Sequence, residues 1–232
     1  MKATAICPTH NRRRYVPSMI ACFLSQTCAD SELVIVDDGT DSVADLIPTN
    51  PRIRYTRLEG PRRTTGSKRN MCCALARGEF IIHFDDDDWS AEGRVADQIS
   101  ALESSGRQVM TYHNFLYWNV DNCKIYRFRP MSPRCPYGAT FCYRRSWWEQ
   151  HCFDDVMLGE DTNFGRAAER EGKFVYSAAG QFMVVRAHNN NTSPTSVHMG
   201  SSGVPATGRE EIPPEFFADE DKIRRTACLK LA

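Results

Sequence analysis

The sequence predicts an α/β fold with a mostly parallel sheet, and two features indicate it. Short apolar runs typical of buried strands alternate with segments of helical periodicity along the first half of the 232 residues. Strands that alternate with helices of this length are joined by crossover units, which place neighbouring strands parallel. A chain of this size can bury one large core.

The first half contains four predicted strands and three predicted helices. We expect strands at 3–7, 33–36, 53–58 and 79–83, and helices at 15–26, 67–77 and 91–104. The first helix is indicated by apolar residues at helical spacing between Tyr15 and Leu24. Gly78 and Gly106 follow the other two helices, where a left-handed residue commonly ends a helix.

The second half has shorter and more varied elements. The apolar segments 109–118 and 124–128 flank Asn119–Asn122, which predicts a hairpin. We also expect strands at 137–143, 174–177 and 182–186, a helix beginning at 146–148, and helices at 162–170 and 219–231. Segment 189–208 is rich in Asn, Ser, Thr, Gly and Pro, which predicts a loop or a mobile lid.

The chain has no net positive charge that would attract nucleic acid or anionic lipid, because 29 Lys and Arg balance 29 Asp and Glu. A basic cluster at 62–69 is either an anion-binding patch or a solvated loop. The ten cysteines include no C-x-x-C pair, so a zinc site is disfavoured and reduced thiols in the cytoplasm are expected. Because Met1–Cys7 runs directly into a predicted strand, we expect no signal peptide. No stretch reaches the ~18 apolar residues of a membrane span.

The most informative motif is the acidic run Asp85–Asp88, directly after the predicted strand 79–83. Four adjacent carboxylates repel one another unless a cation neutralises them. Ligands of open α/β sheets bind at this end of the strands, and oxygen ligands together with a substrate phosphate suit Mg²⁺ or Mn²⁺. The alternative is a solvated acidic turn or a helix N-cap.

Polar groups follow two other strands in the same way, at Pro8–Arg12 and at Asp37–Gly39. Since parallel strands end at one edge of a sheet, the three loops can converge on one ligand. Together with Leu24–Thr27, Arg69–Asn70 and Ala76–Ile81, these motifs resemble the inverting, nucleotide-sugar-dependent glycosyltransferases of family 2. The resemblance is close over residues 3–105 and looser to about 185.

The resemblance implies the GT-A fold: a single Rossmann-like, mostly parallel sheet flanked by helices, with a smaller antiparallel part on the acceptor side. We expect one continuous domain in three parts. Residues 1–105 would bind the nucleotide sugar, residues 106–188 would bind the acceptor and carry the catalytic base, and residues 189–232 would form a flexible loop and a C-terminal helix.

The resemblance also assigns the donor site to nine residues: Pro8, Thr9, Asn11, Arg12, Asp38, Lys68, Arg69, Asp85 and Asp86. Asp38 would accept a hydrogen bond from the uracil imide N–H, unless it only forms a turn. Lys68 or Arg69 would face the base or the phosphates, and Asp85 would lie near the ribose. Asp86 and Asp88 could instead support the metal ligands or the fold.

The implied metal ligand is Asp87, which would hold Mn²⁺ or Mg²⁺ at the diphosphate. His188 follows the strand 182–186 and either completes the metal shell or is a surface histidine. By resemblance Asp161 is the general base, with Glu160 as the second candidate. Their alternative is an acidic pair at a helix N-terminus, where carboxylates are favoured without any chemistry.

The expected function is transfer of a hexose or pentose from a UDP-sugar to an acceptor hydroxyl, with inversion and a divalent metal. The family's processive Gln-x-x-Arg-Trp motif is absent from the sequence, which favours a single addition. Two alternatives are a nucleotidyl- or phosphoryl-transfer enzyme, although no P-loop motif is present, and a non-catalytic nucleotide-binding module. Acceptor candidates are a saccharide, a lipid-linked glycan, a protein side chain and a modified DNA base. Four aromatics would form an acceptor platform or belong to the core: Trp118, Tyr137, Trp147 and Trp148.

Overall fold

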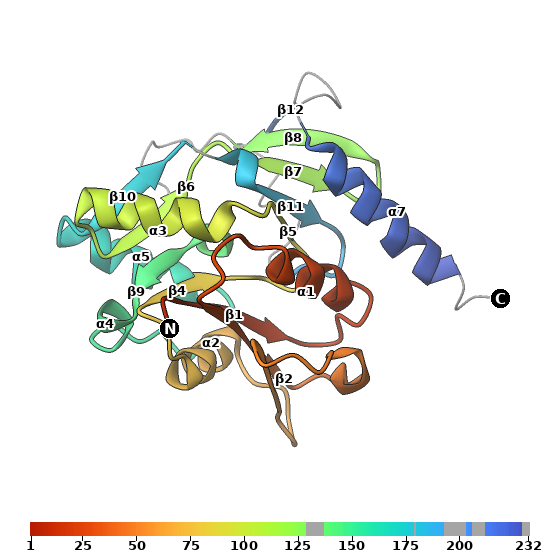
Figure 1. Cartoon of the computed structure of the whole chain (residues 1–232), viewed down its shortest axis with the longest axis horizontal. Coiled ribbons are helices and arrows are strands. Elements are labelled where there is room, and N and C mark those ends of the chain that lie inside the picture. Colours follow the sequence, from red (N-terminus) through yellow and green to blue (C-terminus); the bar gives the residue numbers. More distant parts are fainter. Residues whose placement is uncertain (129–136, 179, 193–202, 206–211, 229–232) are drawn as a thin grey trace.

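Two sheets organise the part of the chain that the computed structural model describes, residues 1–128, 137–178, 180–192, 203–205 and 212–228 (Figure 1). The larger sheet has the strand order β10-β6-β9-β4-β1-β2-β3. Its strands are β1 (Ala3–Thr9), β2 (Ser31–Asp37), β3 (Ile53–Arg57), β4 (Phe80–His83), β6 (Val109–Tyr112), β9 (Cys142–Arg144) and β10 (Phe174–Ser177). All neighbours pair in parallel except β9, which runs antiparallel to β4 and β6. The predicted mixed α/β fold with a mainly parallel sheet is confirmed.

Helices cover both faces of this sheet, and the alternation of side chains along the strands decides which helix meets which face. They are α1 (Val16–Leu24), α2 (Thr65–Leu75), α3 (Arg94–Ser105), α4 (Arg145–Trp148) and α5 (Glu160–Arg170), with single 3₁₀ turns η1 (Ala44–Leu46), η2 (Gly138–Thr140) and η3 (Gly180–Phe182). Ala5 and Ile35 pack in one core cluster with α1 and α3, whereas Ile6 and Val34 pack in another with α2 and α5. Strands covered on both faces are expected to be largely apolar, and β1 and β2 are buried along almost their whole length with apolar central residues.

The smaller sheet lies beside the larger one and is mostly antiparallel, as the resemblance implied. Its order is β12-β8-β7-β11-β5, with strands β5 (Trp89–Ser90), β7 (Leu116–Asn119), β8 (Lys124–Phe128), β11 (Met183–Ala187) and β12 (Gly203–Pro205). Only β7 and β11 are parallel. The last helix, α7 (Pro214–Cys228), packs on this part through the buried side chain of Phe216.

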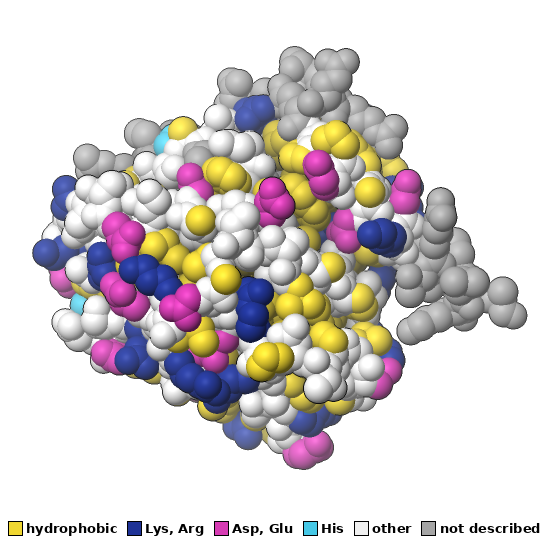
Figure 2. Space-filling model, viewed as in Figure 1, with side chains coloured by type: hydrophobic (Ala, Val, Ile, Leu, Met, Phe, Trp, Pro, Cys, Tyr) yellow, Lys and Arg dark blue, Asp and Glu magenta, His cyan; other side chains and the backbone are white. Residues whose placement is uncertain are grey.

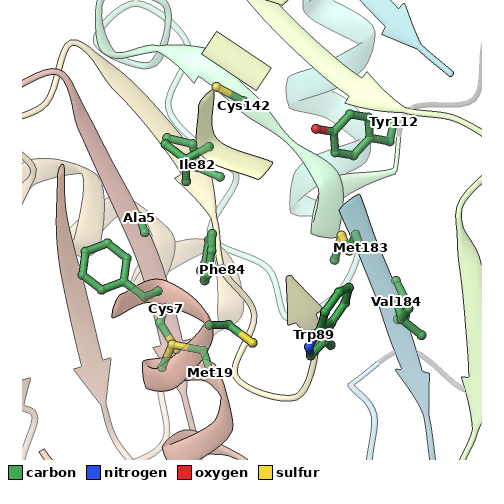
Figure 3. Close-up of a cluster of buried hydrophobic side chains, with 14 of the residues drawn as sticks. Ala5, Cys7, Met19, Ile82, Phe84, Trp89, Tyr112, Cys142, Met183 and Val184 are labelled. Carbon is green, nitrogen blue, oxygen red and sulfur yellow. The ribbon is translucent and has the colours of Figure 1, made fainter. Parts of the chain in front are cut away.

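The acidic run is held between the two sheets by the aromatic residues at its ends. Phe84 continues from β4 and Trp89 begins β5, and both are buried in the same cluster. Figure 3 shows Phe84 close to the β1–α1 side of this cluster and Trp89 beside Met183 and Val184 of β11. The backbone of Asp85–Asp88 is therefore fixed at both ends.

Three predictions in the second half are wrong in detail, although the hairpin of β7 and β8 is confirmed. The predicted strand 109–118 is two strands in different sheets, separated at Asn114, which has a left-handed φ of 69°. The predicted strand 137–143 begins with the turn η2, and only Cys142–Arg144 is extended. In the predicted loop 189–208, residues 203–205 form β12, while 193–202 and 206–208 lie outside the described residues.

The surface viewed in Figure 2 carries both signs of charge, and the cysteines whose side chains are described are unpaired. Figure 2 shows cationic and acidic side chains interspersed on the face viewed there. Among the ion pairs of the structure, Lys2 contacts both Glu79 and Glu103. Every cysteine that the structure describes is a free thiol. Within the described ranges, no helix is both long enough and apolar enough to cross a bilayer.

Candidate active site at the strand ends

The loops after β1 and β2 contact each other at the carboxyl ends of these strands. Asn11 adopts a left-handed φ of 57°, and its side-chain oxygen accepts the backbone N–H of Asp41 at 3.0 Å. Gly39 packs against this loop so closely that an added Cβ would lie 2.6 Å from the Asn11 nitrogen. Pro8 and Thr9 lie opposite the end of β2 in the parallel register. The loop predicted to bind the donor is thus held next to Asp38 by a hydrogen bond and by close packing.

Asp38 lies at the centre of a cationic and amide cradle. Its Oδ1 accepts from Lys68 Nζ at 2.7 Å and contacts His10 Nδ1 at 2.9 Å, while its Oδ2 accepts the backbone N–H of Arg63 at 2.6 Å. Lys68 also donates to the carbonyl of Thr9 at 2.9 Å, which fixes its ammonium group. Burial alone would raise the pKa of Asp38, but the hydrogen bonds from Lys68 and Arg63 and the nearby charge lower it. Asp38 is therefore an ionised acceptor.

Asp86 and Asp87 share one guanidinium. Arg12 Nε lies 3.5 Å from Asp86 Oδ1 and 3.6 Å from Asp87 Oδ2. Burial, followed by the charge of Asp87, raises the pKa of Asp86 to about 8. The pKa of Asp87 is lowered although burial opposes this, because His188 and Arg12 favour its charged form. The surroundings therefore favour the charged form of Asp87 more than that of Asp86.

Asp87 also meets the loop that follows β11. Its Oδ2 lies 3.1 Å from His188 Nε2 and accepts from Asn191 Nδ2 at 3.2 Å. The ring of His188 stacks on Tyr15 with centroids 5.1 Å apart. The two residues that sequence reasoning assigned to the metal therefore lie together, 101 positions apart in the chain.

Asp85 and Asp88 have different surroundings. Asp85 is half-buried and lies 3.2 Å from Arg69 Nη1. Asp88 is buried, and its Oδ1 accepts the backbone N–H of Arg186 at 3.0 Å, which ties the run to β11. The four carboxylates thus have four different sets of partners.

Arg69 connects the donor side of the site to the start of α5. Its side chain is buried, with Nη1 on Asp85 and Nε 3.1 Å from Glu160 Oε1. Burial raises the pKa of Glu160, and the Arg69 guanidinium offsets this only in part. Arg69 therefore bridges two carboxylates, while Lys68 is the residue of this pair that faces Asp38.

Asp161 is the more accessible carboxylate of the acidic pair on α5, because Glu160 is buried against Arg69. The helix begins after Gly159, which has a φ of 84°. The Asp161 side chain packs against Gly138 in η2, where an added Cβ would lie 1.9 Å from Asp161 Oδ2 and 2.5 Å from its Cγ. Only glycine at position 138 leaves room for this carboxylate.

Gly138→Ala is therefore expected to lower kcat about 10²-fold by rotating the Asp161 carboxylate out of place. Donor binding is expected to be unchanged, because Asp38 and the acidic run lie elsewhere. The measurement is steady-state kinetics beside UDP binding by calorimetry. Gly106→Ala is the control, since a Cβ there meets nothing within 4 Å. Its φ of 65° is unfavourable for alanine, so this substitution should lower the stability of the fold and leave kcat unchanged. An unchanged kcat in Gly138→Ala would contradict this packing argument.

The donor atoms at the acidic run fit a divalent cation that a bound diphosphate helps to hold. Carboxylate oxygen suits both Mn²⁺ and Mg²⁺, whereas an imidazole nitrogen is a ligand of transition metals and so favours Mn²⁺ over Mg²⁺. No group of three or more His, Cys, Asp or Glu side chains is arranged to hold a metal by itself in the parts of the chain that are described. Asp87 and His188 would therefore supply only part of the coordination shell.

The four aromatic residues considered as an acceptor platform do not lie on one surface. Trp118 is buried against Phe216, and Trp147 is buried in the other core cluster. Trp148 donates to Asn70 Oδ1 at 2.9 Å, and Tyr137 packs on the rings of Phe115 and Tyr117. Sequence reasoning also missed His10, Gly138 and Arg186. For Arg186 a signal existed, namely one charged residue inside the apolar strand 183–187.

The sequence is similar to known glycosyl transferases. The family model described as glycosyl transferase family 2 matches residues 4–147. The glycosyl transferase WcaA of Escherichia coli is 31% identical over 172 residues, which are 65% of this chain and 59% of WcaA. The chain therefore spans less than two thirds of that relative.

Two solved structures have the same fold. Staphylococcus aureus TarS (residues 1–349) in complex with UDP-GlcNAc matches with a TM-score of 0.69 and 20% identity, over 88% of this chain and 62% of that one. The mannosyltransferase PcManGT of Pyrobaculum calidifontis, in complex with GDP-Man and Mn²⁺, matches with a TM-score of 0.67 and 16% identity, over 82% of this chain and 58% of that one. These likenesses confirm the predicted GT-A fold.

Proposed function

The chain belongs to glycosyl transferase family 2, and from that premise we propose that it transfers a sugar from a UDP-sugar to an acceptor hydroxyl, with inversion and with a divalent metal ion. The observation that carries the proposal is the arrangement of three carboxylates: Asp38 follows β2, Asp87 follows β4, and Asp161 lies in the first turn of α5, which Arg69 links to the acidic run through Glu160 and Asp85. Asp38 would bind the nucleotide base, Asp87 would bind the metal ion at the diphosphate, and Asp161 would take the proton of the acceptor hydroxyl.

The hydrogen-bond acceptor positions of the Asp38 carboxylate favour uracil over guanine as the base of the donor. A carboxylate accepts about four hydrogen bonds. Lys68 Nζ and the backbone N–H of Arg63 use two of those positions, and His10 uses a third, on Oδ1, when its Nδ1 carries the proton. On Oδ2, one hydrogen-bond acceptor position then has no donor among the described residues. Uracil presents a single imide N–H, whereas guanine presents two adjacent N–H groups that pair with both oxygens of a carboxylate. The complex of TarS with UDP-GlcNAc is a second argument for a UDP-sugar.

The acidic run would hold the diphosphate through a metal ion on Asp87 and His188. When bound, a divalent cation stabilises the negative charge that develops on the leaving diphosphate. The Mn²⁺ complex of the mannosyltransferase supports such an ion in this fold. Arg12 lies against Asp86 and Asp87 and adds a fixed positive charge beside the place of the phosphates.

Asp161 would act as the general base. The acceptor oxygen attacks the anomeric carbon from the side opposite the diphosphate, and Asp161 takes the hydroxyl proton as the new carbon–oxygen bond forms. The bond from the anomeric carbon to the phosphate oxygen breaks, and its electron pair leaves with the diphosphate. Attack from the opposite side inverts the anomeric configuration. Glu160 is less suited to this role, because it is buried and paired with Arg69.

A donor screen tests the proposal. The protein is incubated with UDP-sugars, GDP-sugars or nucleoside triphosphates, with Mn²⁺ or with EDTA, and thermal stabilisation and slow donor hydrolysis are measured. We expect stabilisation by UDP-sugars that depends on the metal and is lost in Asp38→Asn. Asp41→Asn is the matched control, since it changes an exposed carboxylate of the same loop. No response to any UDP-sugar, or a response to triphosphates alone, would contradict the proposal.

A further inference from the structure

Arg186 is a charged residue whose side chain is completely buried in the strand β11. Its guanidinium donates to three oxygens: Glu220, Asp219 Oδ2 at 2.6 Å, and the backbone carbonyl of Asp87 at 3.0 Å. Its own backbone N–H donates to Asp88 Oδ1 at 3.0 Å. One residue thus holds both the backbone and a side chain of the acidic run.

The two carboxylates that balance Arg186 come from the C-terminal helix α7. Charged side chains are almost never fully buried unless they are paired, and removing one partner of such a pair leaves an uncompensated charge. Glu220 is itself buried, and the Arg186 guanidinium lies over the ring of Phe216 at 5.1 Å. Figure 1 shows α7 alongside the smaller sheet, outside the region 4–147 that matches the family model.

The position of Arg186 links this ionic cluster to the metal ligands. His188 is two residues further along the chain, and its Nε2 lies 3.1 Å from Asp87 Oδ2. The geometry of Asp87 toward His188 therefore depends on how firmly the peptide between Asp87 and Asp88 is held on β11. The Arg186 guanidinium holds the carbonyl of this peptide, and the Arg186 backbone N–H holds the side chain of Asp88.

We propose that Arg186, fixed by Asp219 and Glu220 of α7, is a positioning residue of the metal–diphosphate site. It sets the spacing of Asp87 and His188, so the C-terminal helix contributes to the geometry of the donor site through Asp219 and Glu220. The inference rests on the proposed function, because it assigns Asp87 and His188 to the metal. It predicts a defect in metal affinity and leaves the uracil cradle at Asp38 unaffected.

The test compares Arg186→Lys, Glu220→Gln and Asp219→Asn with the unaltered protein. Lysine keeps the charge but loses the planar fork that reaches three oxygens. Mn²⁺ binding is followed by electron paramagnetic resonance of the free ion, and UDP binding by calorimetry with Mn²⁺ and with EDTA. We expect Mn²⁺ affinity, and UDP affinity in Mn²⁺, to fall about 10- to 100-fold. UDP affinity in EDTA should be unchanged.

Glu215→Gln and Asp221→Asn are matched controls, because both remove an exposed carboxylate from the same helix. Circular dichroism checks folding, and the three variants remain independent if one of them fails to fold. Folded variants with normal Mn²⁺ affinity would overturn the inference, and so would equal losses of UDP affinity in Mn²⁺ and in EDTA. If the unaltered protein binds Mn²⁺ but no UDP, the proposed function fails while the Mn²⁺ titrations still decide the role of Arg186. Binding of neither ligand overturns both.

Discussion

Asp161→Asn is expected to lower kcat about 10²- to 10⁴-fold, which is the usual contribution of a general base. Asparagine has nearly the same shape as aspartate, so the packing against Gly138 is kept while the ability to take a proton is lost. The affinity for a UDP-sugar should be unchanged, because Asp38 and Asp87 are intact. The measurement is turnover at saturating donor and acceptor together with calorimetry of UDP.

Two further variants make this result specific. Asp155→Asn removes a carboxylate from the segment before α5, where its partner is the hydroxyl of Thr64, and should leave turnover unchanged. Glu160→Gln unpairs the buried Arg69, so it should lower stability as well as activity. If turnover persisted in Asp161→Asn and disappeared in Glu160→Gln without loss of stability, Glu160 would be the base instead.

Asp87→Asn is expected to lower activity about 10²- to 10³-fold by removing the charged ligand of the divalent cation. A neutral amide cannot balance the charge of the ion, and His188 alone is a weak site. The same loss should follow when EDTA strips the metal from the unaltered protein. Activity is measured over a Mn²⁺ titration for both proteins.

The two treatments should not add. In Asp87→Asn, EDTA should cause no further loss, because both changes remove the same interaction. Asp86→Asn provides the comparison within the run, since Asp86 meets Arg12 and not His188, and the protein should stay sensitive to EDTA. Full EDTA sensitivity in Asp87→Asn would mean that the metal is held elsewhere.

The first half of the fold could be predicted because its elements obey local rules. Apolar runs and helical periodicity mark β1, α1, β2, β3, α2, β4 and α3, and the structure shifts their ends. The short elements η1 and β5 were not predicted, and the prediction that Gly78 is left-handed is wrong, because α2 ends three residues earlier. The segment 109–118 could not be divided in advance, because it is apolar throughout. Its break at Asn114 comes from the need to pass from one sheet to the other, which composition does not show.

Local motifs marked residues that the structure brings together at the strand ends, whereas contacts between residues distant in the sequence could not be predicted. Asp37 and Asp38 are adjacent and identical, yet Asp37 is fully buried and accepts from Gly39 N and Tyr55 Oη, whereas Asp38 lies in the cradle. The contact of Arg186 with Asp219 and Glu220 spans more than 30 positions. No periodicity connects such residues, so only the folded chain identifies them.

The ion pair between Arg69 and Glu160 sets a condition on chimeras within the family. Arg69 belongs to the part predicted to bind the donor and Glu160 to the part predicted to bind the acceptor, so a graft that exchanges the second part also exchanges the partner of a buried cation. A graft without an acidic residue at 160 would leave Arg69 with Asp85 alone. Gly66 adds a steric condition, since a Cβ there would lie 1.8 Å from the carbonyl oxygen of Asp154. New acceptor specificities are therefore best grafted with the segment 154–160 kept from this chain.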